Sequence, residues 1–123
     1  MTSNEIKAKT EKIMLYISED YLFDNPDILL ERSKLLLNYQ SDMPALIFAA
    51  QSLKSDCELT NIEIAPMKRK ILCSKEHELL DFVKNAQKAL SQASKTTQSQ
   101  LAILRAELEA TMRGRDFITP KKQ

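Results

Sequence analysis

The stretch IEIAPMKRKIL, residues 62–72, decides the fold because a proline interrupts an otherwise regular helical pattern. Apolar residues keep the helical spacing of three and four across Pro66, namely Ile64, Met67 and Ile71. A proline inside a helix removes one backbone hydrogen bond and costs about 3 kcal/mol or more. The pattern fits either one kinked helix or a break followed by a short helical turn. We favour the break, which predicts a connector over residues 66–73.

The segment before this proline carries the most regular apolar pattern in the chain. Its positions alternate in steps of four and three, which is the heptad pattern of helices that pack side by side as in a coiled coil. The members are Leu46, Ala50, Leu53, Cys57, Thr60 and Ile64, with Met67 and Ile71 beyond the proline. Asp42 is the expected N-cap and Pro44 is tolerated in a first turn, so we expect a helix over residues 43–65.

The N-terminal region predicts two shorter helices. Thr2 and Glu5 form a capping-box pattern that starts the first helix, which should end near residues 22–24. Asn25 followed by Pro26 is a helix start signal, and it predicts a second helix that extends to about Tyr39. Carboxylates gather around the turn between the two helices, and we interpret them as solvated caps: Glu19, Asp20, Asp24 and Asp27.

The region after the connector predicts the longest helix, with Ser74 as N-cap and Gly114 as its end. About 39 residues make a rod of roughly 58 Å, whereas a compact domain of this size has a radius of gyration of about 14 Å. The rod must therefore project, and its apolar stripe needs a partner. We expect self-association through Leu79, Val83, Ala86, Leu90, Ala93, Leu101, Leu104, Leu108 and Met112. The polar stretch 91–100 is either a solvated part of the rod, a polar layer inside an oligomer or a face that contacts a flexible partner.

Length and composition predict one all-α domain over residues 1–114, a helical hairpin or bundle, followed by a basic flexible tail over 115–123. The chain has 123 residues and only one glycine, which argues against β-hairpins and glycine-rich phosphate loops. No apolar run is long enough to span a membrane, and no signal-peptide core is present. Two cysteines without a signal peptide suit a reducing compartment, so we expect a cytoplasmic protein without membrane contact.

No group of residues has the arrangement typical of catalysis or metal binding. The only histidine, His77, lies in a charged first turn and is expected at the surface. Cys57 occupies an apolar position, while Cys73 lies beside cations that can lower a thiol pKa. Two cysteines and one histidine at wide spacing do not make a structural zinc site. We therefore expect a protein that is not an enzyme and needs no cofactor or metal.

Charge is divided unevenly along the chain. Residues 1–66 hold 6 basic and 11 acidic groups, whereas residues 67–123 hold 12 basic and 6 acidic groups. This asymmetry indicates a half that contacts a polyanion, association between unlike halves of neighbouring copies, or clustering on solvated faces. The candidate nucleic-acid contacts are Lys68, Arg69, Lys70, Lys75, Lys84, Lys88, Lys95, Arg113, Arg115, Lys121 and Lys122. We expect the connector cluster Lys68, Arg69 and Lys70 to be their centre. Aromatic residues for base stacking are sparse in this half.

The stretch KNAQKALSQASKTTQSQLAILRAELEATMRGRDFI, residues 84–118, resembles the last helix of small phage-encoded recombination mediator proteins. The resemblance rests on a Leu/Ala stripe and on Arg113 and Arg115, and it covers less than a third of the chain. Proteins of that family are short and all-helical, assemble as rings and load a recombinase on single-stranded DNA. The resemblance implies an oligomer associated with nucleic acid. The residues themselves also allow a chaperone, adaptor or scaffold whose stripe receives a client helix.

Overall fold

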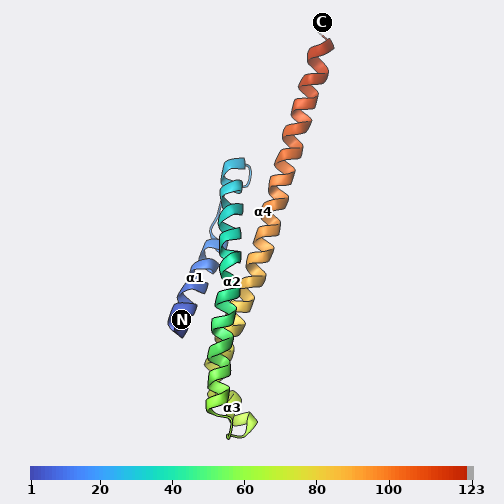
Figure 1. Ribbon diagram of the computed structural model, residues 1–123. Coiled ribbons are helices and arrows are strands. Elements are labelled where there is room, and N and C mark those ends of the chain that lie inside the picture. Colours follow the sequence, from blue (N-terminus) through green and yellow to red (C-terminus); the bar gives the residue numbers. More distant parts are fainter. Residues whose placement is uncertain (122–123) are drawn as a thin grey trace.

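The computed structural model describes residues 1–121, with side chains described as far as residue 113. This part of the chain is all-α, as predicted, and contains no strand. Its elements are α1 (Ser3–Ser18), α2 (Pro26–Thr60), α3 (Pro66–Leu72) and α4 (Ser74–Lys121). The two long helices α2 and α4 fold back on each other as an antiparallel hairpin, α1 packs along them, and α3 lies at the closed end (Figure 1).

The predicted break at Pro66 is confirmed, although the helix before it ends at Thr60 rather than Ala65. Asn61 caps that end, because its backbone N–H and its side-chain amide both donate to the Cys57 carbonyl, at 3.2 and 2.8 Å. Pro66 is then the first residue of α3. At that position the missing N–H leaves no helical hydrogen bond unmade, and the fixed φ of proline suits a helix start.

The apolar pattern contributes to the core only as far as Leu53 and does not continue as one packed seam across Pro66. Met67 is 83% exposed and Ile71 is 72% exposed, so neither side chain is buried in the hairpin. The helix axis changes direction between α2 and α3, and positions that share a stripe in one straight helix no longer face the same neighbour (Figure 1). The spacing across Pro66 is therefore a property of the sequence that the fold does not use.

The prediction of separate helices to Tyr39 and over 43–65 is wrong, because α2 is a single helix of 35 residues with Pro44 inside it. Pro44 is exposed, so the Gln40 carbonyl that loses its N–H partner lies on a face open to water. On the other face Met43 and Leu46 are buried. Each such side chain contributes roughly 1.5–3 kcal/mol on burial, which together offset the cost of the proline.

The first helix starts as predicted but ends earlier than residues 22–24. Thr2 is the N-cap of α1, and its hydroxyl accepts from the Glu5 backbone N–H at 3.2 Å. The helix stops at Ser18, which leaves residues 19–25 as the connector to α2. Asn25 caps α2 as expected, since its side chain accepts from two backbone N–H groups of the first turn.

The core lies between the two long helices and α1. It contains side chains from all three: Ile6, Ile13, Leu36, Met43, Leu46, Ala50, Leu80, Val83, Ala86 and Leu90. Gly114 was expected to end the last helix, but helical backbone continues to Lys121. A helix-ending glycine adopts a positive φ, and no residue of the described chain does so. At 48 residues α4 is about 72 Å long, so its C-terminal part extends well past α2 (Figure 1).

Candidate nucleic-acid and assembly interfaces

The three consecutive cations after Pro66 do not act alike. The Arg69 guanidinium donates from Nη2 to the carbonyls of Ile62 and Ile64, both at 3.1 Å. These bonds fix the connector between α2 and α3. The Arg69 side chain is half-buried, whereas Lys68 and Lys70 are exposed. Two of the three predicted phosphate contacts are free to meet a ligand, and the third stabilises the turn that presents them.

The closed end of the hairpin, residues 59–75, is here named the tip. Five large apolar side chains are more than half exposed on it: Leu59, Ile62, Met67, Ile71 and Leu72. Lys68, Lys70 and Lys75 are the exposed cations of the tip, and Glu63 is its one acidic residue. Exposed apolar clusters that are rimmed by charge are typical of interaction surfaces. The tip is thus an apolar and cationic surface rather than a purely basic one.

The two cysteines meet where the tip joins the hairpin. Both are free thiols, Cys73 is buried and Cys57 is half-buried. A hydrogen bond with the Cys73 thiol, then burial and the nearby Glu76 carboxylate, raise the pKa of the Cys57 thiol to about 11. A raised pKa keeps the thiol protonated and makes it a poor nucleophile. The burial of Cys73 likewise keeps its sulfur away from solvent, so neither cysteine has the setting of a reactive thiol.

His77 connects the two long helices beside this thiol pair. Its Nε2 lies 3.0 Å from Oε1 of Glu58, which places the imidazole of α4 against a carboxylate of α2. The side chain is partly exposed, in line with the surface position expected for it. No nucleophile is paired with it by a hydrogen bond within the described residues. We interpret the pair as a contact that closes the hairpin.

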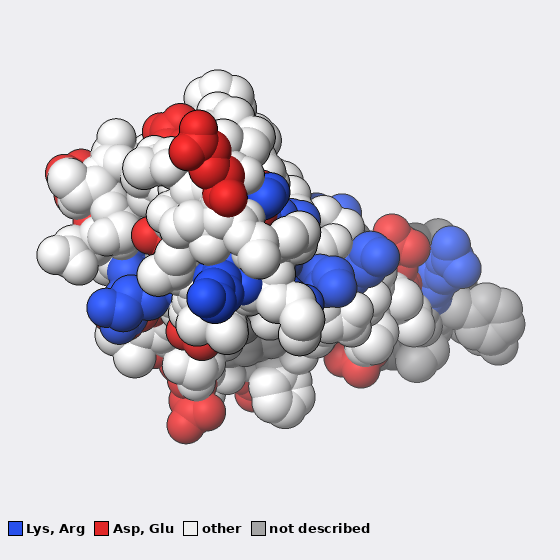
Figure 2. Space-filling model, turned by 90° about the horizontal axis from the view of Figure 1, so that it is seen from below, with Lys and Arg blue, Asp and Glu red and all other residues white. Residues whose placement is uncertain are grey.

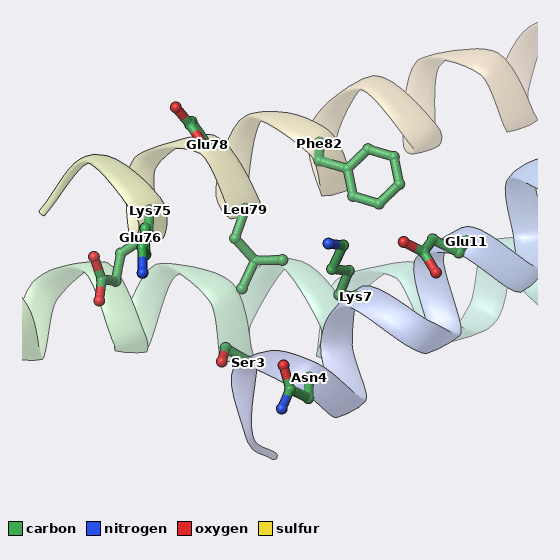
Figure 3. A pocket seen from close by; sticks show the side chains of 9 residues that line it. All are labelled: Ser3, Asn4, Lys7, Glu11, Lys75, Glu76, Glu78, Leu79 and Phe82. Atoms are coloured by element: carbon green, nitrogen blue, oxygen red, sulfur yellow. The ribbon is translucent and has the colours of Figure 1, made fainter.

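An open cleft of about 520 Å³ separates the start of α1 from the start of α4 (Figure 3). Lys75, predicted as a phosphate contact, lies at one end of it, and Lys7 of α1 projects toward Phe82 (Figure 3). Three carboxylates also line the cleft, from Glu11, Glu76 and Glu78. Because both signs of charge mix there, the cleft has no net preference for a polyanion. Helical spacing also places Lys75 about 180° around α4 from Lys84, so it is separated from the remaining cations of that helix.

The cations of the middle of α4 form a straight row. Lys84, Lys88 and Lys95 are exposed, and a helix of 3.6 residues per turn places all three within an arc of about 40°. Arg113, also exposed, falls on the same line about 44 Å from Lys84. No acidic residue occurs between Asp81 and Glu107. Figure 2, which looks at the tip end of the molecule, shows Lys and Arg side chains in a row with acidic groups mostly to either side.

The first half of the predicted oligomer stripe is already occupied within the chain. Val83, Ala86 and Leu90 are fully buried, and Leu79 and Ala93 pack against the same core. These five residues contact α1 and α2 in place of a second copy. The prediction of one long self-association stripe is corrected accordingly, because only its C-terminal members remain available.

Those members lie on the part of α4 that extends past α2, residues 101–113, here named the overhang. Its lower limit is marked by the Tyr21 hydroxyl, which donates to Oε1 of Gln100 at 2.7 Å and ties the α1–α2 connector to α4. Leu101 and Leu104 are partly exposed. Leu108 is 60% exposed and Met112 is 54% exposed. The overhang is thus an amphipathic helix whose apolar face is partly covered near Gln100 and, among the described residues, has no neighbour at Leu108 and Met112.

The polar stretch 91–100 has one solvated side and one packed side, since Gln92, Lys95, Thr96, Gln98 and Ser99 are exposed. Ser94 and Thr97 are buried within the single chain, and the Thr97 hydroxyl donates to the Ala93 carbonyl at 2.9 Å. An intrahelical bond of this kind satisfies a buried hydroxyl without any partner from another element. The buried side of the stretch therefore belongs to the packed part of α4, and its small side chains allow close approach of the neighbouring helices.

Arg32 is a structural residue that sequence reasoning missed. It is buried, and its guanidinium carbon lies 3.9 Å from the Tyr21 ring centroid and 5.3 Å from that of Tyr16. Its Nη2 also donates to the Ile17 carbonyl at 3.2 Å. A buried guanidinium over aromatic rings contributes a cation–π interaction. The sequence offered no clear signal for this role, since Arg32 lies two residues from Lys34 in a charged part of the predicted helix.

The remaining candidates and the comparisons with known proteins add no further site. The side chains of Arg115, Lys121 and Lys122 lie outside the described residues. In the part that is described, no three His, Cys, Asp or Glu residues come together as metal ligands, and no helix has the length and hydropathy needed to cross a bilayer. No protein-family model, curated protein or solved structure matches this chain.

Proposed function

We propose that this protein is a non-enzymatic, self-associating helical protein that binds nucleic acid along α4, as an accessory factor in recombination or replication. The observation that carries the proposal is the straight row formed by Lys84, Lys88 and Lys95 on a stretch of helix without acidic residues. Lysines neutralise phosphates and release counterions without any defined motif. A row along a rigid helix is suited to follow a sugar–phosphate backbone.

The neighbourhood of the row supports contact with the backbone rather than with the bases. Phe82, the nearest aromatic residue on α4, is half-buried at the cleft with α1 and offers no free ring for stacking. Base stacking on aromatic side chains contributes about 1–3 kcal/mol per base in single-strand binding proteins. Without it we expect binding that is modest for one chain, insensitive to sequence and strongly dependent on salt.

Self-association is the second part of the proposal, and the overhang supports it. Leu108 and Met112 are more than half exposed, and no other helix of the described chain packs against α4 at that point. Bringing several chains together would place several cation rows on one nucleic acid, and such multivalency raises the overall affinity of weak sites. The alternative is an adaptor or scaffold. The same exposed overhang favours it, since an apolar stripe can also receive an amphipathic helix of another protein.

The test is fluorescence anisotropy of a labelled single-stranded oligonucleotide at two salt concentrations. We expect the wild type to bind, and the triple variant Lys84→Gln, Lys88→Gln, Lys95→Gln to bind more weakly on all sequences. Each phosphate contact on a single strand contributes about 0.7 to the salt slope, so the slope should fall by roughly 2. Glutamine keeps helix propensity close to that of lysine, so the fold should be unchanged.

The matched control removes three exposed lysines from another helix. Lys7, Lys9 and Lys12 are all exposed on α1, and their change to glutamine lowers the net charge by the same amount. We expect that variant to keep most of the binding. An equal loss in both variants would mean that overall charge, not the row on α4, drives binding. A wild type that does not bind even at low salt would refute the nucleic-acid function and favour the adaptor.

A further inference from the structure

The overhang and the α1–α2 connector are neighbouring surfaces at the open end of the hairpin, because α4 continues past the connector and α2 does not. Leu101 and Leu108 follow Val83 and Leu90 by eighteen residues each, which is five turns at 3.6 residues per turn. Val83 and Leu90 are buried on the side of α4 that packs into the core. Leu101 and Leu108 therefore face the same way, into the space beyond the start of α2. Leu104 and Met112 bear the same relation to Ala86 and Ser94.

The connector supplies the second of these two surfaces. Leu22 is 62% exposed and Phe23 is 63% exposed on residues 19–25, directly beside the point where Tyr21 contacts Gln100. We name the combined surface the ledge: its wall is the apolar face of the overhang and its floor is the connector. The acidic residues around the floor are exposed, namely Glu19, Asp20, Asp24 and Asp27. The ledge is thus apolar with an acidic edge.

The tip, at the opposite end of the hairpin, has the complementary character. Met67, Ile71 and Leu72 are exposed there, and Lys68 and Lys70 stand beside them. Contact between the two surfaces would bury the apolar side chains of both and would bring the cations of one near the carboxylates of the other. The two surfaces lie at opposite ends of α2, which is about 52 Å long (Figure 1). One molecule cannot bring its own tip to its own ledge.

We propose that the occupant of the ledge is the tip of a second copy of this chain. The contact is head-to-tail, so every molecule offers a free tip at one end and a free ledge at the other. Such heterologous contacts generate a ring if the rotation closes and a filament if it does not. This inference rests on the self-association part of the proposed function, and it names the two surfaces that meet. It does not depend on nucleic-acid binding.

Two charge-reversed variants test the contact. The tip variant carries Lys68→Glu and Lys70→Glu, and the ledge variant carries Asp20→Lys and Asp24→Lys. All four residues are exposed and lie outside the core, and Arg69 is kept because it holds the connector. Each variant alone brings like charges together at the contact, so association measured by sedimentation should weaken by at least about tenfold. Matching circular dichroism spectra and melting temperatures establish that the variants fold.

Mixing the two variants in equal amounts is the decisive step. The acidic tip of one variant then meets the basic floor of the other, and the native basic tip meets the native acidic floor. The mixture should therefore assemble, with the two variants alternating, at concentrations where neither variant does so alone. Variants that associate like wild type when alone would overturn the proposal and indicate pairing of overhangs instead. Failure of the mixture to assemble would also overturn it. A wild type that stays monomeric at about 100 µM would refute self-association, while oligonucleotide binding is measured separately.

Discussion

The two halves of α4 carry the same apolar stripe, yet only one half buries it. Val83 and Leu90 are fully buried between α1 and α2, whereas Leu108, eighteen residues after Leu90, is 60% exposed. The residue types and their spacing do not differ in a way that explains this. The difference is that α2 begins at Pro26, opposite the middle of α4, and leaves the rest of the helix without a neighbour. An amphipathic stripe therefore predicts that a helix packs, but not what it packs against.

The largest loss of stability should come from a charge placed in the half of α4 that packs against α1 and α2. Leu90→Asp places a carboxylate in the centre of the core, where it loses apolar contacts and has no partner for its charge. We expect a loss of roughly 4 kcal/mol or more in the free energy of unfolding, measured by denaturation in urea. The variant should be largely unfolded rather than a folded monomer. A well-folded variant would show that the core is less tightly packed than its burial indicates.

The boundary between the halves is set by the contact of Tyr21 with Gln100. Tyr21→Phe removes the hydroxyl that donates to the amide oxygen at 2.7 Å but keeps the ring over Arg32. A single hydrogen bond of this kind contributes about 1 kcal/mol, so we expect that loss in stability. Hydrogen exchange should show faster opening of α4 around Gln100, with the tip end unchanged. Tyr39→Phe is the control, since no bond to that hydroxyl is found within the described residues.

A Leu→Asp change in the overhang should lower the mass in solution but leave stability nearly unchanged, unlike the same change in the core. Leu108→Asp changes an exposed side chain on a part of α4 without intramolecular partners, so stability should change by no more than about 0.5 kcal/mol. The mass in solution, measured by light scattering, should nevertheless fall toward that of a monomer. Ala106→Asp, on the polar side of the same segment, is the matched control and should leave the mass unchanged. If both variants keep the wild-type mass, the overhang does not take part in association.

The smallest effect should be a pH dependence of stability that comes from Cys57, at the end of the hairpin near the tip. The pKa of Cys57 is about 11 in the fold, above its ordinary value of 9.0, because the neighbouring thiol and burial disfavour the thiolate. Folding therefore favours the protonated thiol. Its contribution to stability is complete below pH 9 and is lost as the pH rises through 11. Comparing wild type with Cys57→Ser between pH 8 and pH 11 isolates this contribution from other groups, such as Tyr16, whose pKa burial also raises.

Local chemistry was sufficient to predict the ends of several helices. Thr2 and Asn25 accept hydrogen bonds from backbone N–H groups that have no partner within the helix, and that requirement is met within a few residues of the chain. Pro66 also acts locally, since a proline suits the first position of a helix. The hairpin followed from this break together with two long amphipathic segments. These features need no knowledge of distant residues.

The candidate sites were predictable only in part, because a side chain's partners come from its fold. Arg69 and Lys70 are adjacent cations, yet one holds two carbonyls and the other is exposed. Arg32 is buried because Tyr16 and Tyr21 are brought over it from the preceding helix and connector. The row of lysines on α4 was readable from helical spacing, and so was its separation from Lys75, which lies about half a turn around the helix from Lys84. What spacing did not show is that Lys75 lines a cleft whose other side is α1.

What the sequence by itself determined is the helical class, the turn at Pro66 and the pairing of two long amphipathic helices, because backbone hydrogen bonding and side-chain spacing act over a few residues. Only the tertiary structure decided that α2 runs through Pro44, since burial of Met43 and Leu46 offsets the lost hydrogen bond. It also decided which half of the stripe on α4 is buried. Burial is a relation between segments distant in sequence, and the ends of α2 set where that relation stops.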